Sequence, residues 1–302
     1  MLLDERDSQH GAPRRKGGSS TSKVVLTTLS AILAVGVVGV GVAAKLHSKH
    51  SPSKVVAVKL ATPPVTPPVS PPASWKLTFN PSFTGTTLDS AVWNTCYPWD
   101  TSSSGCTNFG NTSDEDKEWY LSSQDQVSGG VLHLVAQRKP TPGSDQQGAP
   151  KEYACRSGMV TTFPGFRFEY GYVQVVAKLP FGKGLWPALW LAAANEKWPP
   201  EIDIEEHWHT DAFERVYLHP TVGPRQGGEV STPNLATGWH TFTLSWTKTR
   251  LSWYFDGKQV FTTTTDIPQQ SMYLIANLAV DDASPGGCSG SLLIKSIKVW
   301  QP

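Results

Sequence analysis

One short acidic segment carries the residue types best suited to chemistry. It reads Pro-Pro-Glu-Ile-Asp-Ile-Glu-Glu-His-Trp over residues 199–208. In a regular β-strand, alternation would place Glu201, Asp203 and Glu205 on one face and the two isoleucines on the other. Like charges on one face repel one another, and no Lys or Arg lies within residues 198–213. Folding alone gives no reason to keep such a face, so we interpret the segment as a candidate catalytic site.

The spacing of these carboxylates suits nucleophilic and acid–base catalysis on a sugar. Cα atoms four residues apart on a strand are about 13 Å apart, and two glutamates leaning together leave about 5–6 Å between their carboxyl groups. Retaining glycosidases need about 5–5.5 Å between the nucleophile and the acid/base. An aspartate between them can hold the nucleophile and, through its charge, raise the pKa of the acid. One strand can therefore carry the whole catalytic set.

The chain from residue 75 onward consists of short β-rich segments separated by Gly, Pro, Asn and Ser. These segments are residues 131–137, 170–179, 201–208, 240–246, 250–256, 273–280 and 291–300. Several of them alternate at period two, and no stretch longer than about ten residues keeps a helical apolar period. Asp256-Gly257 predicts a hairpin turn with positive φ. The pattern predicts an all-β sandwich or barrel for residues 75–302.

The acidic motif is surrounded by further segments in an order typical of one enzyme family. They are GGVLHLVAQR (129–138), SGMVTT (157–162), FEYGYVQVVAKLPFGKGLWPALWL (168–191), GWHTFTLSWTKTRLSWYFDGKQV (238–260), MYLIANLAV (272–280) and SLLIKSIKVWQ (291–301). Together with EIDIEEH, they resemble glycoside hydrolase family 16, the laminarinase and lichenase group. The resemblance implies a jelly-roll β-sandwich with a sugar cleft on its concave face. It also implies endo-hydrolysis of a β-glucan, with β-1,3-glucan favoured.

The resemblance also implies a role for each acidic residue. Glu201 is expected to be the nucleophile and Asp203 the assisting carboxylate, with Glu206 or Glu205 as the acid/base. Strict alternation favours Glu205, whereas a β-bulge would bring Glu206 onto the same face as Glu201. Family members with one inserted residue read Glu-Ile-Asp-Ile-x-Glu-His, so we predict Glu206 as the acid/base and Glu205 as an accessory acid at the bulge.

Aromatic side chains are expected to supply platforms on which pyranose rings stack. By the same resemblance we predict that Trp186, Trp190, Trp208 and His219 bind substrate, and Trp198 is a further candidate. Packing in the core is the alternative for each tryptophan. We expect no required cofactor and no catalytic metal, although a structural calcium ion is compatible with the sequence.

The first 74 residues differ in composition from the rest, because they contain neither Trp nor Cys. Residues 1–23 are polar and basic, and residues 24–44 form an uncharged apolar run. At about 1.5 Å per residue that run spans the ~30 Å hydrocarbon core of a membrane. We predict a transmembrane signal anchor there, with a cleaved signal peptide as the alternative, and a Pro-rich linker over residues 45–74.

Cysteine usage and charge suggest the compartment and the partners. The four cysteines form an even set without CxxC spacing. Cys96 and Cys106 could close a short loop, which would leave Cys155 for Cys288; other pairings and free thiols stay open. Disulfides favour a domain outside the cell, anchored in the cell membrane or secreted after cleavage. The net charge of +1 without a basic stripe argues against nucleic acid, and we expect a monomer that binds polysaccharide.

Three other functions stay open from sequence. A non-catalytic glucan-binding protein on the same fold would be expected to lose the glutamates, which this chain keeps. A transglycosylase would use the same carboxylates with a sugar acceptor. A metal-dependent β-barrel enzyme could use His207 and His209, because His-x-His on a strand places both imidazoles on one face.

Overall fold

The computed structural model describes residues 70–98, 107–109, 116–145, 147–208, 213–232, 235 and 237–302. The predicted membrane segment 24–44 lies outside these residues, as do residues 1–23 and most of the predicted linker 45–74. Within the described part, no helix has the length and apolar character needed to cross a membrane.

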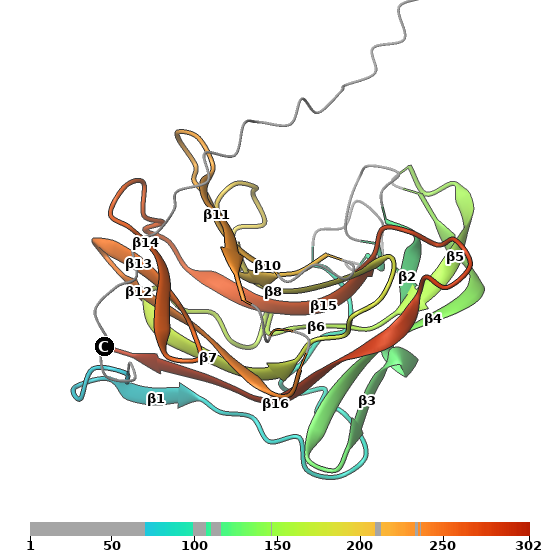
Figure 1. Ribbon diagram of the computed structural model, residues 1–302, viewed down its shortest axis with the longest axis horizontal. Helices are drawn as coiled ribbons and strands as arrows, with labels where there is room; N and C mark the ends of the chain where they lie inside the picture. Colours follow the sequence, from blue (N-terminus) through green and yellow to red (C-terminus); the bar gives the residue numbers. More distant parts are fainter. Residues whose placement is uncertain are drawn as a thin grey trace, which may run out of the picture. The chain divides into compact units, whose positions relative to one another are not determined.

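Almost every regular element of the described chain is a β-strand (Figure 1). The strands are β1 Lys76–Phe79, β2 Glu118–Tyr120, β3 Asp125–Ser128, β4 Val131–Ser144, β5 Pro150–Ser157, β6 Met159–Thr161, β7 Gly171–Lys178, β8 Leu185–Ala193, β9 Glu201–Glu206, β10 Phe213–His219, β11 Gln226–Ser231, β12 His240–Thr247, β13 Arg250–Phe255, β14 Lys258–Thr263, β15 Met272–Val280 and β16 Ser289–Gln301. A single 3-10 turn, η1 Ser122–Gln124, precedes β3 in this part of the chain. The all-β expectation is confirmed.

The strands form two sheets. The larger sheet has the order β14-β13-β12-β7-β16-β4-β5-β2, with β1 paired to β16 and β3 paired to β4. The smaller sheet has the order β11-β10-β9-β8-β15-β6. The acidic strand β9 therefore lies inside the smaller sheet, hydrogen-bonded to β8 and β10 on its two sides.

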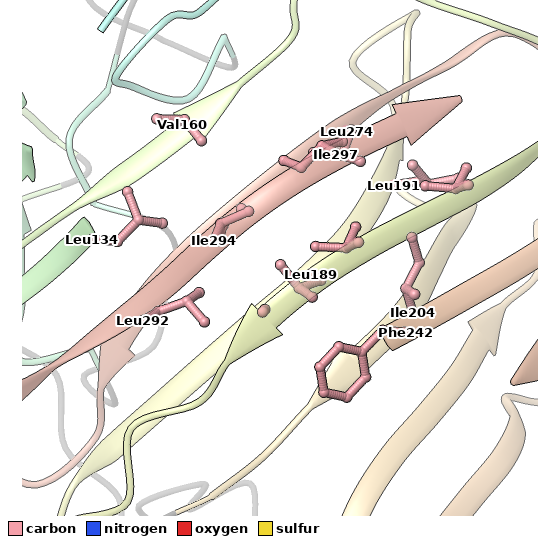
Figure 2. Packing of buried hydrophobic residues seen from close by; sticks show 14 of the residues in the cluster. Leu134, Val160, Leu189, Leu191, Ile204, Phe242, Leu274, Leu292, Ile294 and Ile297 are labelled. Carbon is pink, nitrogen blue, oxygen red and sulfur yellow. The ribbon is translucent and has the colours of Figure 1, made fainter. Parts of the chain in front are cut away.

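The two sheets pack face to face as the predicted sandwich. Period-two alternation sends every second side chain of each strand into the interface between them. Figure 2 shows Leu189 and Leu191 of β8 and Ile204 of β9 in this core with Phe242 of β12 and Ile294 of β16. Each of these side chains is at most 1% exposed. The opposite face of the smaller sheet does not pack against the larger sheet, and we call it the outer face.

Two local sequence signals are confirmed. Asp256 and Gly257 form the two-residue turn between β13 and β14, with φ values of 47° and 78°. Cys155 of β5 and Cys288, just before β16, form a disulfide across the larger sheet. Cys96 is also disulfide-bonded, and its predicted partner Cys106 lies outside the described residues.

Candidate active site

The acidic strand β9 contains a β-bulge. Asp203 lies opposite Trp190 of β8, and Glu205 lies opposite the adjacent residue Leu189. Two steps along β9 thus match one step along β8, so Ile204 is the extra residue. The pairing of β9 with β10 shifts at the same point. An inserted residue turns the side chains that follow it to the opposite faces of the sheet.

The bulge decides which glutamates share a face. Leu189 is buried in the core between the sheets, and Glu205 beside it is fully buried as well. Glu206 lies opposite Ala188, on the same face as Asp203 and Glu201. The expectation from strict alternation, with Glu205 beside Glu201, is therefore wrong, and the predicted bulge is present. Glu205 points away from the outer face, so it does not sit where an accessory acid would act.

His219 contacts the first two acidic residues of the strand. It lies opposite Glu201 in the β9–β10 pairing. Its Nε2 atom is 3.5 Å from Glu201 Oε1 and 3.2 Å from Asp203 Oδ2. Tyr217, two residues earlier on β10, lies opposite Asp203 and presents its ring edge to His219. The structure thus brings together three predicted site residues from two neighbouring strands.

Glu206 is held by a tryptophan from β8. Trp186 Nε1 donates a hydrogen bond of 3.0 Å to Glu206 Oε1. The ring of Trp186 meets the ring of Trp208 edge to face, with centroids 5.5 Å apart. The guanidinium of Arg215 covers the Trp208 ring at 4.0 Å and pairs with Glu229 at 3.1 Å. Of the predicted tryptophans, Trp186 therefore contacts the predicted acid/base directly, and Trp208 packs against Trp186.

The remaining two tryptophan candidates differ in exposure: Trp190 is half-buried and Trp198 is exposed. Trp190 lies opposite Asp203, but its Nε1 donates to Asn277 Oδ1 at 2.8 Å and its ring packs near Tyr97. These contacts hold the half-buried Trp190 ring on the outer face, on the strand beside Asp203. Trp198 is 68% exposed, and its ring centroid lies 5.9 Å from that of His219. Trp198 is therefore the candidate whose ring is most open to a ligand.

Burial and mutual repulsion alter the protonation of the carboxyl groups. Burial raises the pKa of Glu201, the charge of Asp203 raises it further, and His219 opposes the rise. Burial also raises the pKa of Glu206, against the hydrogen bond from Trp186 and the charge of His219. The pKa of Asp203 is raised by burial and by Glu206. Such a cluster keeps a proton on one carboxyl while another is ionised, as acid–base catalysis requires.

Sequence reasoning missed two arginines near the carboxylates. Arg225 lies 4.2 Å from the Tyr217 ring, and its charge lowers the pKa of both Asp203 and Glu206. Arg215 lies opposite Glu206 on β10. Arg215 and Tyr217 precede His219 at period two, so this alternation is a signal that could have placed them on the outer face.

The residues proposed for a metal-dependent enzyme do not form a site in the described chain. His207 is fully buried and packs on Phe181, with ring centroids 4.2 Å apart. His209 lies outside the described residues. Among the described residues, the group with metal-ligating geometry is Glu201, Asp203 and His219.

Comparisons with known proteins agree with this geometry. The model of glycosyl hydrolases family 16 matches residues 113–288. The chain is 32% identical to Endo-1,3-1,4-beta-glycanase ExsH of Rhizobium meliloti over 67% of this chain and 44% of that protein. It is 28% identical to Glucan endo-1,3-beta-glucosidase A1 of Niallia circulans over 70% of this chain and 34% of that protein. The chain thus spans less than half the length of these curated relatives.

A solved structure shows the same fold. The catalytic domain of an endo-1,3-beta-glucanase (laminarinase) from Thermotoga petrophila superposes with a TM-score of 0.63 at 27% sequence identity. The match covers 75% of this chain and 98% of that domain. The predicted jelly-roll sandwich is therefore confirmed.

Proposed function

Because the chain belongs to glycosyl hydrolase family 16, we propose that it is a retaining endo-glycosidase that hydrolyses β-glucan, with β-1,3-glucan as its substrate. One observation carries the proposal: the bulge in β9 places Glu201, Asp203 and Glu206 on one face of the sheet. A nucleophile and an acid/base on one rigid strand match the requirement of a double-displacement mechanism.

In the first step, Glu201 attacks the anomeric carbon while Glu206 gives its proton to the leaving oxygen. The glycosidic bond breaks, an ester bond forms between the sugar and Glu201, and Glu206 becomes a carboxylate. Glu206 suits the role of acid because burial raises the pKa of its carboxyl. The hydrogen bond from Trp186 Nε1 to Oε1 fixes the direction of that carboxyl.

In the second step, Glu206 works as a base. It takes a proton from water, the resulting hydroxide attacks the anomeric carbon, and the ester bond to Glu201 breaks. The two inversions return the original anomeric configuration. A sugar hydroxyl in place of water would give transglycosylation, which product analysis distinguishes.

Asp203 and His219 position the nucleophile in this scheme. Asp203 lies between the two glutamates on the strand, and its negative charge raises the pKa of Glu201. His219 contacts both Glu201 and Asp203 and opposes that effect. Asp203 and His219 thus have opposite effects on the pKa of the nucleophile, which is a carboxylate before the attack and an uncharged ester after it.

The names of the relatives support a β-1,3-glucan substrate. The similar proteins are an endo-1,3-1,4-β-glycanase, an endo-1,3-β-glucosidase and a laminarinase. The near-neutral balance of 26 basic and 25 acidic residues gives no support to sulfated galactans. The β-1,3 linkage is common to the three names.

We also propose that the catalytic domain works outside the cell, anchored through residues 24–44. The disulfide between Cys155 and Cys288 supports an oxidising compartment. The apolar run of residues 24–44 supports the anchor.

The test is product analysis with the full-length chain on laminarin, mixed-linkage glucan and carrageenan. We expect internal cleavage of laminarin, with products that keep the β configuration in NMR spectra recorded during the reaction. Glu201→Gln is expected to abolish turnover, and azide is expected to rescue it with an inverted product. Wild-type products of inverted configuration would contradict the retaining mechanism, and cleavage of carrageenan alone would contradict the substrate.

A further inference from the structure

We propose that Glu201, Asp203 and His219 also form a binding site for Zn²⁺, and that the bound ion blocks glycoside hydrolysis. The metal site stands on geometry alone, whereas the inhibition rests on the proposed function. The ion is an inhibitor in this proposal and takes no part in the reaction.

The three donor atoms already have the spacing of a zinc site. One nitrogen and two carboxylate oxygens lie within 4.8 Å of one another. His219 Nε2 is 3.5 Å from Glu201 Oε1 and 3.2 Å from Asp203 Oδ2. A tetrahedral Zn²⁺ with bonds of about 2.0–2.2 Å holds its ligand atoms about 3.3–3.5 Å apart. Two of the three spacings therefore match without movement, and the third, between the two carboxylates, is no longer than 4.8 Å.

The donor set also has the chemistry that zinc prefers. One imidazole with two carboxylates leaves a fourth position for water, as in the open sites of zinc enzymes. The two negative charges neutralise the ion, which removes the repulsion between Glu201 and Asp203. A cation at this position would therefore relieve an unfavourable interaction of the empty cluster.

Asp203 provides an independent sign of a missing partner. Its side chain is 4% exposed, and no described residue donates a hydrogen bond to its Oδ2 atom. The close contact with His219 Nε2 lacks hydrogen-bond geometry. A buried carboxylate oxygen without a donor is costly, and a metal ion in the space that it shares with His219 would satisfy it.

The backbone holds the ligands in place, and solvent can reach them. Glu201 and His219 lie opposite each other on adjacent hydrogen-bonded strands, β9 and β10. Their side chains are 18% and 22% exposed, so an ion can enter from the outer face. Ligands on strands are positioned more accurately than ligands on loops.

Occupancy of this site would exclude the reaction. Zn²⁺ would bind the carboxylate of Glu201, the group that must attack the anomeric carbon in the proposed mechanism. The ion and the sugar would therefore compete for the same carboxylate, and competition raises KM without changing kcat.

Binding is tested by equilibrium dialysis of the full-length chain against Zn²⁺, with Co²⁺ as a spectroscopic substitute that reports tetrahedral coordination. The variants are Asp203→Asn, which keeps the shape of the side chain, and His219→Gln. The matched control is His133→Gln, because His133 lies on β4 of the larger sheet and contacts Ser128. We expect wild type and His133→Gln to bind one more equivalent of Zn²⁺ than either site variant, whose folding is checked by circular dichroism.

Equal stoichiometry in all four proteins would overturn the metal site. Inhibition is tested by laminarin hydrolysis, in which Zn²⁺ is expected to raise KM severalfold at unchanged kcat, with reversal by a chelator. Hydrolysis that stays unaffected at a saturating Zn²⁺ concentration would overturn the inhibition. If wild type binds the extra equivalent but hydrolyses no glucan, the proposed function and the inhibition fail while the metal site stands.

Discussion

Glu205 and Glu206 are neighbours in the chain, yet their side chains lie on opposite faces of β9. Glu206 points to the outer face and accepts a hydrogen bond from Trp186, whereas Glu205 is fully buried between the sheets. The bulge at Ile204 produces this separation, because Glu205 lies opposite the core residue Leu189. The two glutamates therefore form a natural pair for testing which face carries the chemistry.

The first prediction concerns the acid/base. Glu206→Gln is expected to lower the rate on a substrate with a poor leaving group by roughly 10²–10⁴-fold and to spare one with a good leaving group, because only the poor one needs protonation. Glu205→Gln, the matched control, is expected to affect both substrates alike. Comparison of kcat/KM on laminarin oligosaccharides and on an activated aryl glucoside decides the matter. The reverse pattern in the two variants would assign the role to Glu205.

The second prediction concerns the stability cost of Glu205. Neither of its carboxylate oxygens has a hydrogen-bond partner in the described chain, and Glu214 lies near enough to raise its pKa beyond the effect of burial. A buried polar group without a partner costs about 1–3 kcal/mol. Glu205→Met, of similar volume, is expected to raise the free energy of unfolding by about this amount.

Urea unfolding of the full-length chain measures this change. Glu152→Met, at an exposed position of β5, is the control and is expected to change stability by less than about 0.5 kcal/mol. A Glu205→Met protein less stable than wild type would show that the carboxyl has a stabilising partner.

The third prediction concerns pH and Asp125 of β3. Burial raises the pKa of this carboxyl from 3.8 to about 9. The folded protein therefore binds a proton that the unfolded chain releases above its ordinary pKa. Stability must fall as pH rises between these two values, with a slope approaching about 1.4 kcal/mol per pH unit.

Asp125→Asn removes this titration, because an amide stays neutral at every pH. We expect the urea midpoint of wild type to fall more steeply than that of Asp125→Asn between about pH 5 and about pH 8. Other buried carboxyls contribute equally to both proteins, so the difference isolates Asp125. Parallel curves for the two proteins would show that Asp125 is ionised in the folded state.

The sequence predicted local features well and side-chain register less well. The turn at Asp256-Gly257 follows from the backbone preferences of those two residues, so it could be read without knowledge of the fold. The bulge depends on how β9 pairs with β8, and the sequence of β9 alone does not reveal that pairing. The bulge was predicted instead from the family pattern Glu-Ile-Asp-Ile-x-Glu-His. Arg215 and Arg225 were missed because their place beside the acids depends on how β10 pairs with β9 and on the path of the segment that follows β10.

The fourth prediction concerns the hydrogen bond between Trp186 and Glu206. The donor Nε1 at 3.0 Å stabilises the ionised carboxylate and so lowers the pKa of Glu206 against the effect of burial. Trp186→Phe keeps an aromatic ring and removes the donor, so the pKa of Glu206 rises. The acid then stays protonated to higher pH, and the alkaline limb of kcat/KM is expected to shift upward. Trp190→Phe is the matched control, because its Nε1 donates to Asn277 instead. A rise in KM with an unmoved alkaline limb would mean that Trp186 only contacts the sugar and does not tune the acid.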